Sequence, residues 1–377
     1  MKLNEDFLAR MREATALLRT AGPIAATEAI QRALSGQDAE TGTPRAPAHQ
    51  AESGRAAGKP WTESMLDRTV EDAVVHEPQG RQSGPASQQG QFLSGSWSEK
   101  SGTRAYRLYV PASSGTETPA KRPLIVMLHG CKQDPDDFAA GTGMNRLADE
   151  HGALVLYPAQ SQNANGSNCW NWFERKSQRR AGGEPAILAG MTRHIMQEYD
   201  IDPARVYVAG LSAGGAMAGI LAAAYPDLFA AVGIHSGLPV GAAKDVASAF
   251  GVMKNGSPKE LAAHDHAIPV IVFHGDRDHT VHPGNGAQAL RQCLGTDVDP
   301  DRIDTRIVKG KAESGRTYTK AIFHDRAGAP VAEHWVVHGS GHSWSGGSKA
   351  GSYTDPKGPD ASAEMMRFFL AHPRRMD

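Results

Sequence analysis

The chain has 377 residues, and its 40 lysines and arginines nearly balance 41 aspartates and glutamates, which leaves a formal net charge of −1. Without an excess or a long run of basic residues, the sequence lacks the electrostatic footprint of proteins that bind nucleic acids or anionic membranes. The longest apolar stretch, residues 213–225, is shorter than the ~18 residues of a membrane-spanning helix, so no membrane span is predicted. The 3 cysteines are too few for a disulfide scaffold.

The first 95 residues are predicted to form two segments of different composition. In residues 1–35, apolar side chains recur at helical spacing on both sides of Pro23, which predicts a helical leader. Residues 36–95 are rich in Gly, Pro, Ser and Gln and bury too little apolar surface to offset their ordering entropy, so a disordered linker is expected. Glu5 and Asp6 interrupt the position at which a signal peptide needs an apolar run, which predicts a cytoplasmic location.

Residues 96–377 show the alternation typical of an α/β domain. Short continuous apolar runs are separated by stretches long enough for helices, which indicates a mostly parallel central sheet with helices on both faces. The runs occur at residues 106–110, 124–128, 154–157, 206–209, 230–234, 270–273 and 335–337. The predicted organisation is therefore a helical leader, a disordered linker and one α/β domain.

The clearest chemical motif is GLSAG at residues 210–214, which follows an apolar run and precedes a helix-compatible stretch. A serine in G-x-S-x-G between a strand and a helix is typical of a nucleophile elbow, a sharp turn that projects the hydroxyl above the edge of a sheet. The flanking glycines would let the strand and helix backbones approach closely. We therefore predict that Ser212 is a nucleophile; the alternative is a serine that merely begins a helix of small residues.

A serine nucleophile needs a base and an acid that orients the base, and in hydrolases with this elbow the acid and then the histidine follow the serine. Asp278, in the run VIVFHGDRDHTV, is the predicted acid, and Asp276 is the alternative. His342 is the predicted base, because its Gly and Ser neighbours allow a loop that brings the imidazole to Ser212. His338, at the end of the last apolar run, is the alternative.

Attack by such a serine produces an oxyanion that needs preorganised N–H donors. One predicted donor is the backbone N–H of Ala213, directly after the nucleophile. The other is the backbone N–H of Cys131, because Gly130 permits a turn after the apolar run LIVML. Histidine pairs such as His264 and His266 lack a matching set of carboxylates or cysteines, so no metal site is predicted.

A set of motifs together resembles the polyhydroxybutyrate (PHB) depolymerase-type esterases of the α/β-hydrolase superfamily. They are LHGCKQD at 128–134, CWNWF at 169–173, GLSAGGAMA at 210–218 and HGSGHSWSGG at 338–347, and the resemblance covers roughly residues 103–370. LHGC and CWNWF are the specific part, since G-x-S-x-G and H-G-x-x-D occur in many hydrolases. The resemblance implies an α/β-hydrolase fold and hydrolysis of carboxylic esters without a cofactor.

The resemblance also implies details around the site. A disulfide between Cys131 and Cys169 would hold the CWNWF segment beside the oxyanion loop, as in similar secreted enzymes; free thiols, as expected in a reducing cytosol, are the alternative. Trp170, Trp172 and Trp344 are predicted to contact the substrate, with core packing as the alternative. An extracellular location, as for secreted members of the family, is the alternative to the cytoplasm.

The expected substrate is a short-chain 3-hydroxyacyl polyester or its oligomers. A feruloyl or acetylxylan esterase would share every predicted catalytic residue and differ only in the pocket. A non-catalytic protein that binds polyester granules is the alternative from another class. Whether the chain is an esterase or a binding protein, the leader at residues 1–35 is a candidate for association with a granule or with a second copy of the chain.

Overall fold

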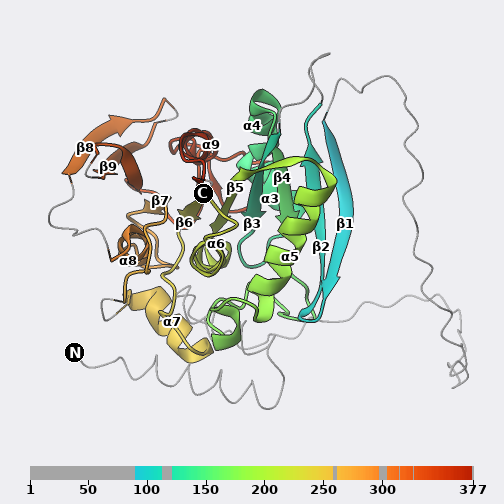
Figure 1. Cartoon of the computed structure of the whole chain (residues 1–377). Helices are drawn as coiled ribbons and strands as arrows, with labels where there is room; N and C mark the ends of the chain where they lie inside the picture. The colour runs from blue at the N-terminus through green and yellow to red at the C-terminus, as the bar shows by residue number, and fades with distance from the viewer. Residues whose placement is uncertain are drawn as a thin grey trace, which may run out of the picture.

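The structure of the chain is a computed structural model that describes residues 90–112, 121–257, 261–296, 304–313, 315–325 and 327–375 (Figure 1). The predicted leader at 1–35 lies outside the described residues, as does most of the predicted linker at 36–95. The end of that linker differs from the prediction, because strand β1 (Gln91–Glu99) begins inside it. β1 pairs with the next strand along its whole length, so backbone hydrogen bonds order a segment that offers little apolar surface.

Within the described part of the chain, the domain is built on a ten-stranded sheet with the order β1-β2-β4-β3-β5-β6-β7-β10-β9-β8. Besides β1, its strands are β2 (Gly102–Val110), β3 (Arg122–Leu128), β4 (Leu154–Pro158), β5 (Ile201–Leu211), β6 (Ala231–His235), β7 (Val270–Gly275), β8 (Asp304–Lys311), β9 (Thr317–His324) and β10 (Pro330–Val337). The neighbours from β4 to β10 in this order are parallel. The pairs at both ends are antiparallel, so the sheet is mixed around a parallel centre (Figure 1).

Each apolar run that the sequence analysis assigned to a strand lies on β10 or on one of the strands β2 to β7. The hairpin of β8 and β9 was not predicted. Its side chains are mostly exposed or half-buried, so it carries no continuous apolar run. Patterns of buried residues therefore found the centre of the sheet and missed its edges.

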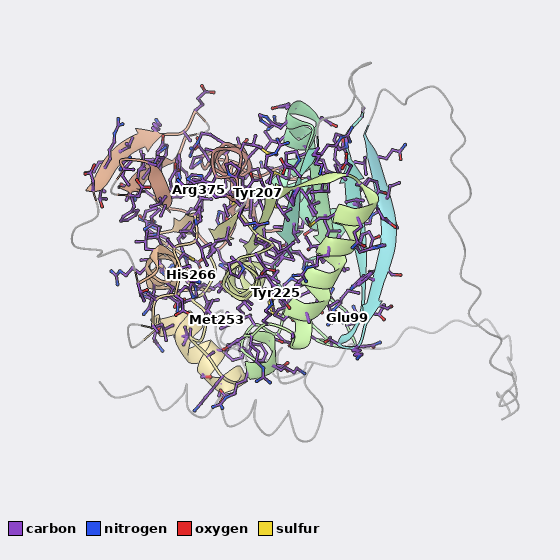
Figure 2. The ribbon with its side chains drawn as sticks, in the orientation of Figure 1. Glu99, Tyr207, Tyr225, Met253, His266 and Arg375 are labelled. Atoms are coloured by element: carbon purple, nitrogen blue, oxygen red, sulfur yellow. A yellow bond between two sulfur atoms is a disulfide. The ribbon has the colours of Figure 1, made fainter. Side chains whose placement is uncertain are left out.

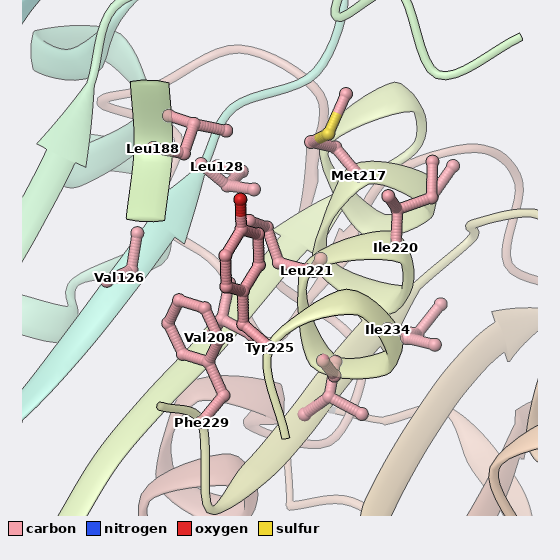
Figure 3. Packing of buried hydrophobic residues seen from close by; sticks show 14 of the residues in the cluster. Val126, Leu128, Leu188, Val208, Met217, Ile220, Leu221, Tyr225, Phe229 and Ile234 are labelled. Atoms are coloured by element: carbon pink, nitrogen blue, oxygen red, sulfur yellow. The ribbon is translucent and has the colours of Figure 1, made fainter. Parts of the chain in front are cut away.

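Helices cover both faces of the sheet and enclose two hydrophobic clusters (Figure 2). They are α3 (Pro135–Thr142), α4 (Met144–His151), α5 (Gly183–Glu198), α6 (Ala213–Ala224), α7 (Val246–Asn255), α8 (Gly284–Leu294) and α9 (Ala361–Ala371). On one face, a cluster brings together residues of α5, α6 and α8 with Val126 and Leu128 of β3, and Figure 3 shows its part around α6. On the other face, the second cluster brings together residues of α3, α4 and α9 with Ile125 and Met127 of β3. Because successive side chains of a strand point to opposite faces of the sheet, β3 contributes residues to both clusters.

The carboxyl ends of the parallel strands lie at one edge of the sheet, where open α/β folds place their binding sites. Here β5 leads into α6, while β7 and β10 lead into loops that carry Asp278 and His342. A short pair of parallel strands, β11 (Trp344–Ser345) and β12 (Thr354–Asp355), follows the latter loop. No helix in the described ranges is both long and apolar enough to cross a membrane.

Candidate active site

Ser212 forms the turn between the end of β5 and the start of α6. Its backbone has φ 58° and ψ −118°, which a residue with a side chain rarely adopts. Such a conformation typically costs about 1–3 kcal/mol and persists only where the surroundings enforce it. The residue is 7% exposed, so the turn is held within the protein and leaves only a small part of Ser212 accessible.

The glycines of the elbow are needed because β3, β5 and α6 approach one another closely. A Cβ at Gly214 would overlap the carbonyl oxygen of Leu128, the last residue of β3. A Cβ at Gly210 would overlap the backbone of Gly214. The predicted reason for the glycines, a close approach of backbones, is therefore confirmed.

Asp278 and His342 meet where the loops after β7 and β10 come together. His342 Nδ1 lies 2.7 Å from Asp278 Oδ2, and the Asp278 side chain is fully buried. The other carboxylate oxygen, Oδ1, accepts hydrogen bonds from the backbone N–H groups of Thr280 and Val281 at 2.9 and 2.8 Å. These bonds fix the carboxylate so that it orients the imidazole ring with Nε2 left available.

The carboxyl of Asp278 is ionised in this environment. Burial by itself raises the pKa of a carboxyl, but the hydrogen bonds from His274 and His342, together with the electrostatic interaction with these rings, hold the pKa of Asp278 well below its usual range. His274 Nε2 lies 3.4 Å from Oδ2 and 2.9 Å from the carbonyl oxygen of Val281. His274 belongs to the same HGDRD segment as Asp278, but no motif indicated a role for it.

The two alternative residues, Asp276 and His338, form a pair of their own. His338 Nδ1 lies 2.9 Å from Asp276 Oδ2, and Asp276 Oδ1 accepts the backbone N–H of Gly339 at 2.7 Å. His338 Nε2 faces the hydroxyl of Thr319 at 2.9 Å. This pair ties the loop after β7 to the start of the loop that carries His342.

The two predicted oxyanion donors come shortly after the ends of neighbouring strands, because β3 and β5 pair in parallel up to Leu128 and Gly210. Ala213 is the first residue of α6, and Cys131 follows the end of β3. Among the described residues, neither backbone N–H has an acceptor, whereas the N–H groups of Lys132 and Gln133 are bonded. Two free donors at one edge of a sheet are what an oxyanion hole requires.

Cys131 and Cys169 form a disulfide, which is one of the two possibilities that the sequence left open. It joins the loop after β3 to the CWNWF segment, which is also held by a buried polar cluster. In this cluster, Oε1 of Glu184 accepts hydrogen bonds from Arg104 (3.3 Å) and Gln160, and its other oxygen, Oε2, accepts the backbone N–H of Asn171 (2.8 Å). Apart from Asn171, which belongs to CWNWF, no motif marked these residues, because they come from distant parts of the chain.

The tryptophans predicted to contact substrate occupy the interior instead. Trp170, Trp172 and Trp344 are 0%, 3% and 1% exposed. The indole N–H of Trp170 donates to the carbonyl oxygen of His129, and that of Trp344 donates to the Ser362 hydroxyl, both at 3.0 Å. Their side chains therefore pack the protein, which is the alternative given above, because a large apolar ring gains more from burial than from exposure at a loop.

The described residues contain no cluster of three or more His, Cys, Asp or Glu side chains that could hold a metal ion.

Residues 104–309 match the model of a protein family described as Esterase PHB depolymerase. Poly(3-hydroxyalkanoate) depolymerase C of Paucimonas lemoignei is 35% identical over 239 residues, which cover 59% of this chain and 55% of that protein. Poly(3-hydroxybutyrate) depolymerase of Ralstonia pickettii is 41% identical over 140 residues, or 35% of this chain and 29% of that protein. Feruloyl esterase B of Neurospora crassa is 30% identical over 229 residues, which cover 54% of this chain and 76% of that protein. The chain thus spans about half or less of the two depolymerases.

Among solved structures, the acetyl xylan esterase from Aspergillus awamori superposes with a TM-score of 0.56 and 19% identity, over 71% of this chain and 94% of that one. At this identity the likeness concerns the fold alone. It agrees with an α/β-hydrolase fold, in which helices cover a sheet with a parallel centre and β5 turns sharply into α6.

Proposed function

The chain belongs to the esterase PHB depolymerase family, and on that premise we propose that it is a carboxylic ester hydrolase whose Ser212 forms an acyl-enzyme. One observation carries the proposal. A strained serine between β5 and α6 lies at the same edge of the sheet as the buried contact between Asp278 and His342. The surrounding fold maintains a costly conformation at the residue that the chemistry requires.

The proposed reaction begins with His342. Its Nδ1 is engaged by Asp278, so Nε2 takes the proton of Ser212 as Oγ attacks the acyl carbon. The ionised Asp278 stabilises the resulting imidazolium and keeps the ring in the required tautomer. Nε2–H then protonates the leaving alkoxide. Water attacks the acyl-enzyme by the same steps and frees Ser212.

The backbone N–H groups of Cys131 and Ala213 would stabilise the oxyanion in both halves of the reaction. Removing one such donor from an oxyanion hole typically costs ~2.7–4 kcal/mol of transition-state stabilisation. The disulfide at Cys131 supports this assignment, because it anchors the loop that would present the first donor. The first turn of α6 anchors the second.

We propose short-chain 3-hydroxyacyl polyesters or their oligomers as the substrate class. The names of the two depolymerase relatives support this choice. The near-zero net charge is compatible with an uncharged ester. A feruloyl-type esterase is the second candidate. It is favoured by the similarity to feruloyl esterase B of Neurospora crassa, because the matched residues cover 76% of that protein.

The test compares wild type with Ser212→Ala on 4-nitrophenyl esters of graded chain length, amorphous PHB and methyl ferulate. We expect Ser212→Ala to lose at least about 10⁴-fold in kcat/KM. Ser348→Ala, at an exposed serine, should keep wild-type activity. Equal rates for wild type and Ser212→Ala would refute the mechanism.

The substrate ranking separates the candidates. Higher kcat/KM on short 3-hydroxyacyl esters and release of products from amorphous PHB support the depolymerase type, whereas a preference for methyl ferulate supports the second candidate. A burst of 4-nitrophenol would exclude the non-catalytic alternative, because a burst reports acyl-enzyme accumulation.

A further inference from the structure

His235, the last residue of β6, lies between the elbow and the acid loop. β6 pairs with β5 on one side and with β7 on the other. The side chain is 1% exposed, and neither the sequence motifs nor the proposed mechanism gives it a role. A buried polar ring at this place in the sheet needs partners, because an unpaired buried polar group is costly.

The partners of His235 are the two parts of the proposed catalytic machinery. Its carbonyl oxygen accepts the backbone N–H of Ser212 at 2.8 Å, a bond that helps to hold the elbow. Its ring nitrogen Nε2 lies 2.9 Å from the backbone nitrogen of Ser345, which comes shortly after His342 in the chain. One residue therefore binds both the nucleophile turn and the loop of the base.

The ring has a defined orientation and tautomer. Since Nε2 accepts from a backbone N–H, a neutral ring carries its proton on Nδ1, which faces the Ser236 hydroxyl at 3.2 Å. The ring stacks on Trp344 with a centroid distance of 5.0 Å and on Phe273 of β7 at 5.7 Å. These contacts explain why Trp344 is buried beside the base instead of exposed to substrate.

Charge at His235 is also restricted. Burial lowers the pKa of His235 well below its usual value, and the charges of His274 and His342 lower it further, while Asp278 acts in the opposite direction. A neutral ring keeps the bond from Ser345 and adds no like charge beside the imidazolium that forms on His342.

We propose that His235 is a positioning residue. Its Nε2 binds the loop that carries His342 and its carbonyl oxygen binds the Ser212 elbow, so that one residue keeps the base and the nucleophile aligned. This inference rests on the proposed serine mechanism. It differs from a role in packing, because it requires a hydrogen-bond acceptor at the position of Nε2 as well as a ring-sized side chain.

The test compares His235→Gln, His235→Asn and His235→Leu. A Gln amide can place an acceptor near the position of Nε2, the shorter Asn amide cannot reach it, and Leu has none; all three keep the backbone bond to Ser212. Rates on a 4-nitrophenyl ester are expressed per active site titrated by the burst. His334→Leu, which replaces a histidine of β10, is the matched control for loss of an imidazole.

We expect kcat to fall about 10- to 100-fold in the Asn and Leu variants, in line with other residues that orient catalytic groups. KM should change little, Gln should stay within about fivefold of wild type, and the control should match wild type. If Leu fails to fold, the contrast between Gln and Asn decides. Equal kcat for wild type, Gln and Asn would overturn the inference while leaving the serine mechanism intact, which Ser212→Ala tests separately.

Discussion

The loops after β7 and β10 meet twice, through Asp278 with His342 and through Asp276 with His338. Both contacts join a carboxylate oxygen to an imidazole Nδ1, at 2.7 and 2.9 Å. Their surroundings differ, because the Asp278 carboxylate is fully buried while the second pair has side chains 38% and 39% exposed. A buried charge acts across a low dielectric, whereas water and salt screen an exposed one.

The comparison separates two tasks. The buried carboxylate faces His274 and His342, so it can support a charge that develops on a catalytic ring. The exposed carboxylate bonds the backbone N–H of Gly339, so it supports the shape of the loop. Residue type and sequence neighbourhood are the same in both pairs, and burial distinguishes them.

The largest expected difference between the pairs concerns catalysis. Asp278→Asn should lower kcat by roughly 10³–10⁴-fold, because an amide no longer stabilises the required tautomer and the imidazolium of His342. Asp276→Asn should lower it less than about tenfold. Steady-state kinetics on a 4-nitrophenyl ester, with thermal unfolding to show that both variants are folded, measures the ratio. A larger loss for Asp276→Asn would assign the catalytic role to the exposed pair.

The next difference concerns the free energy of unfolding in acid. The folded state lowers the pKa of Asp278, so its carboxylate adds stability above the unfolded pKa of about 3.9 that is lost as the pH falls toward the lower folded value. The stability of wild type relative to Asp278→Asn should therefore be constant from about pH 8 to 5 and decrease below about pH 4. Urea unfolding at a series of pH values measures it.

Asp276→Asn provides the control for this titration. The His338 and Gly339 contacts also lower the pKa of Asp276 against the effect of its partial burial, so the direction of the change is the same. Water screens this carboxylate, and the decrease should be smaller than for Asp278. A constant difference between wild type and Asp278→Asn down to pH 2 would contradict the ionised, buried carboxylate.

The smallest expected effect is the response to salt. An exposed ion pair contributes about 0–1 kcal/mol and is screened at high ionic strength. The cost of Asp276→Asn in unfolding free energy should shrink between about 0.05 and 1 M NaCl. The cost of Asp278→Asn should change much less. An equal response of both variants would remove the distinction between the pairs.

Local patterns in the sequence located several features that the structure contains. Continuous apolar runs located the parallel strands from β3 to β7, because such strands are buried on both faces. The motif GLSAG located the strained turn at Ser212, since its glycines are required by backbone contacts within and beside the motif. The edge strands β1 and β8 were missed, as was β9 beside β8, because their stability comes from pairing with their neighbours rather than from an apolar run.

The sequence by itself determined the types of residue and their order along the chain: a serine in an elbow, aspartates after one strand and histidines after another. Only the tertiary structure decided that Asp278 pairs with His342, that Asp276 pairs with His338, and that His235 binds the elbow and the base loop together. It also buried Trp344 beside His235. The physical reason is that these outcomes depend on contacts between segments far apart in the chain, and on the burial that such contacts produce, neither of which is contained in a local motif.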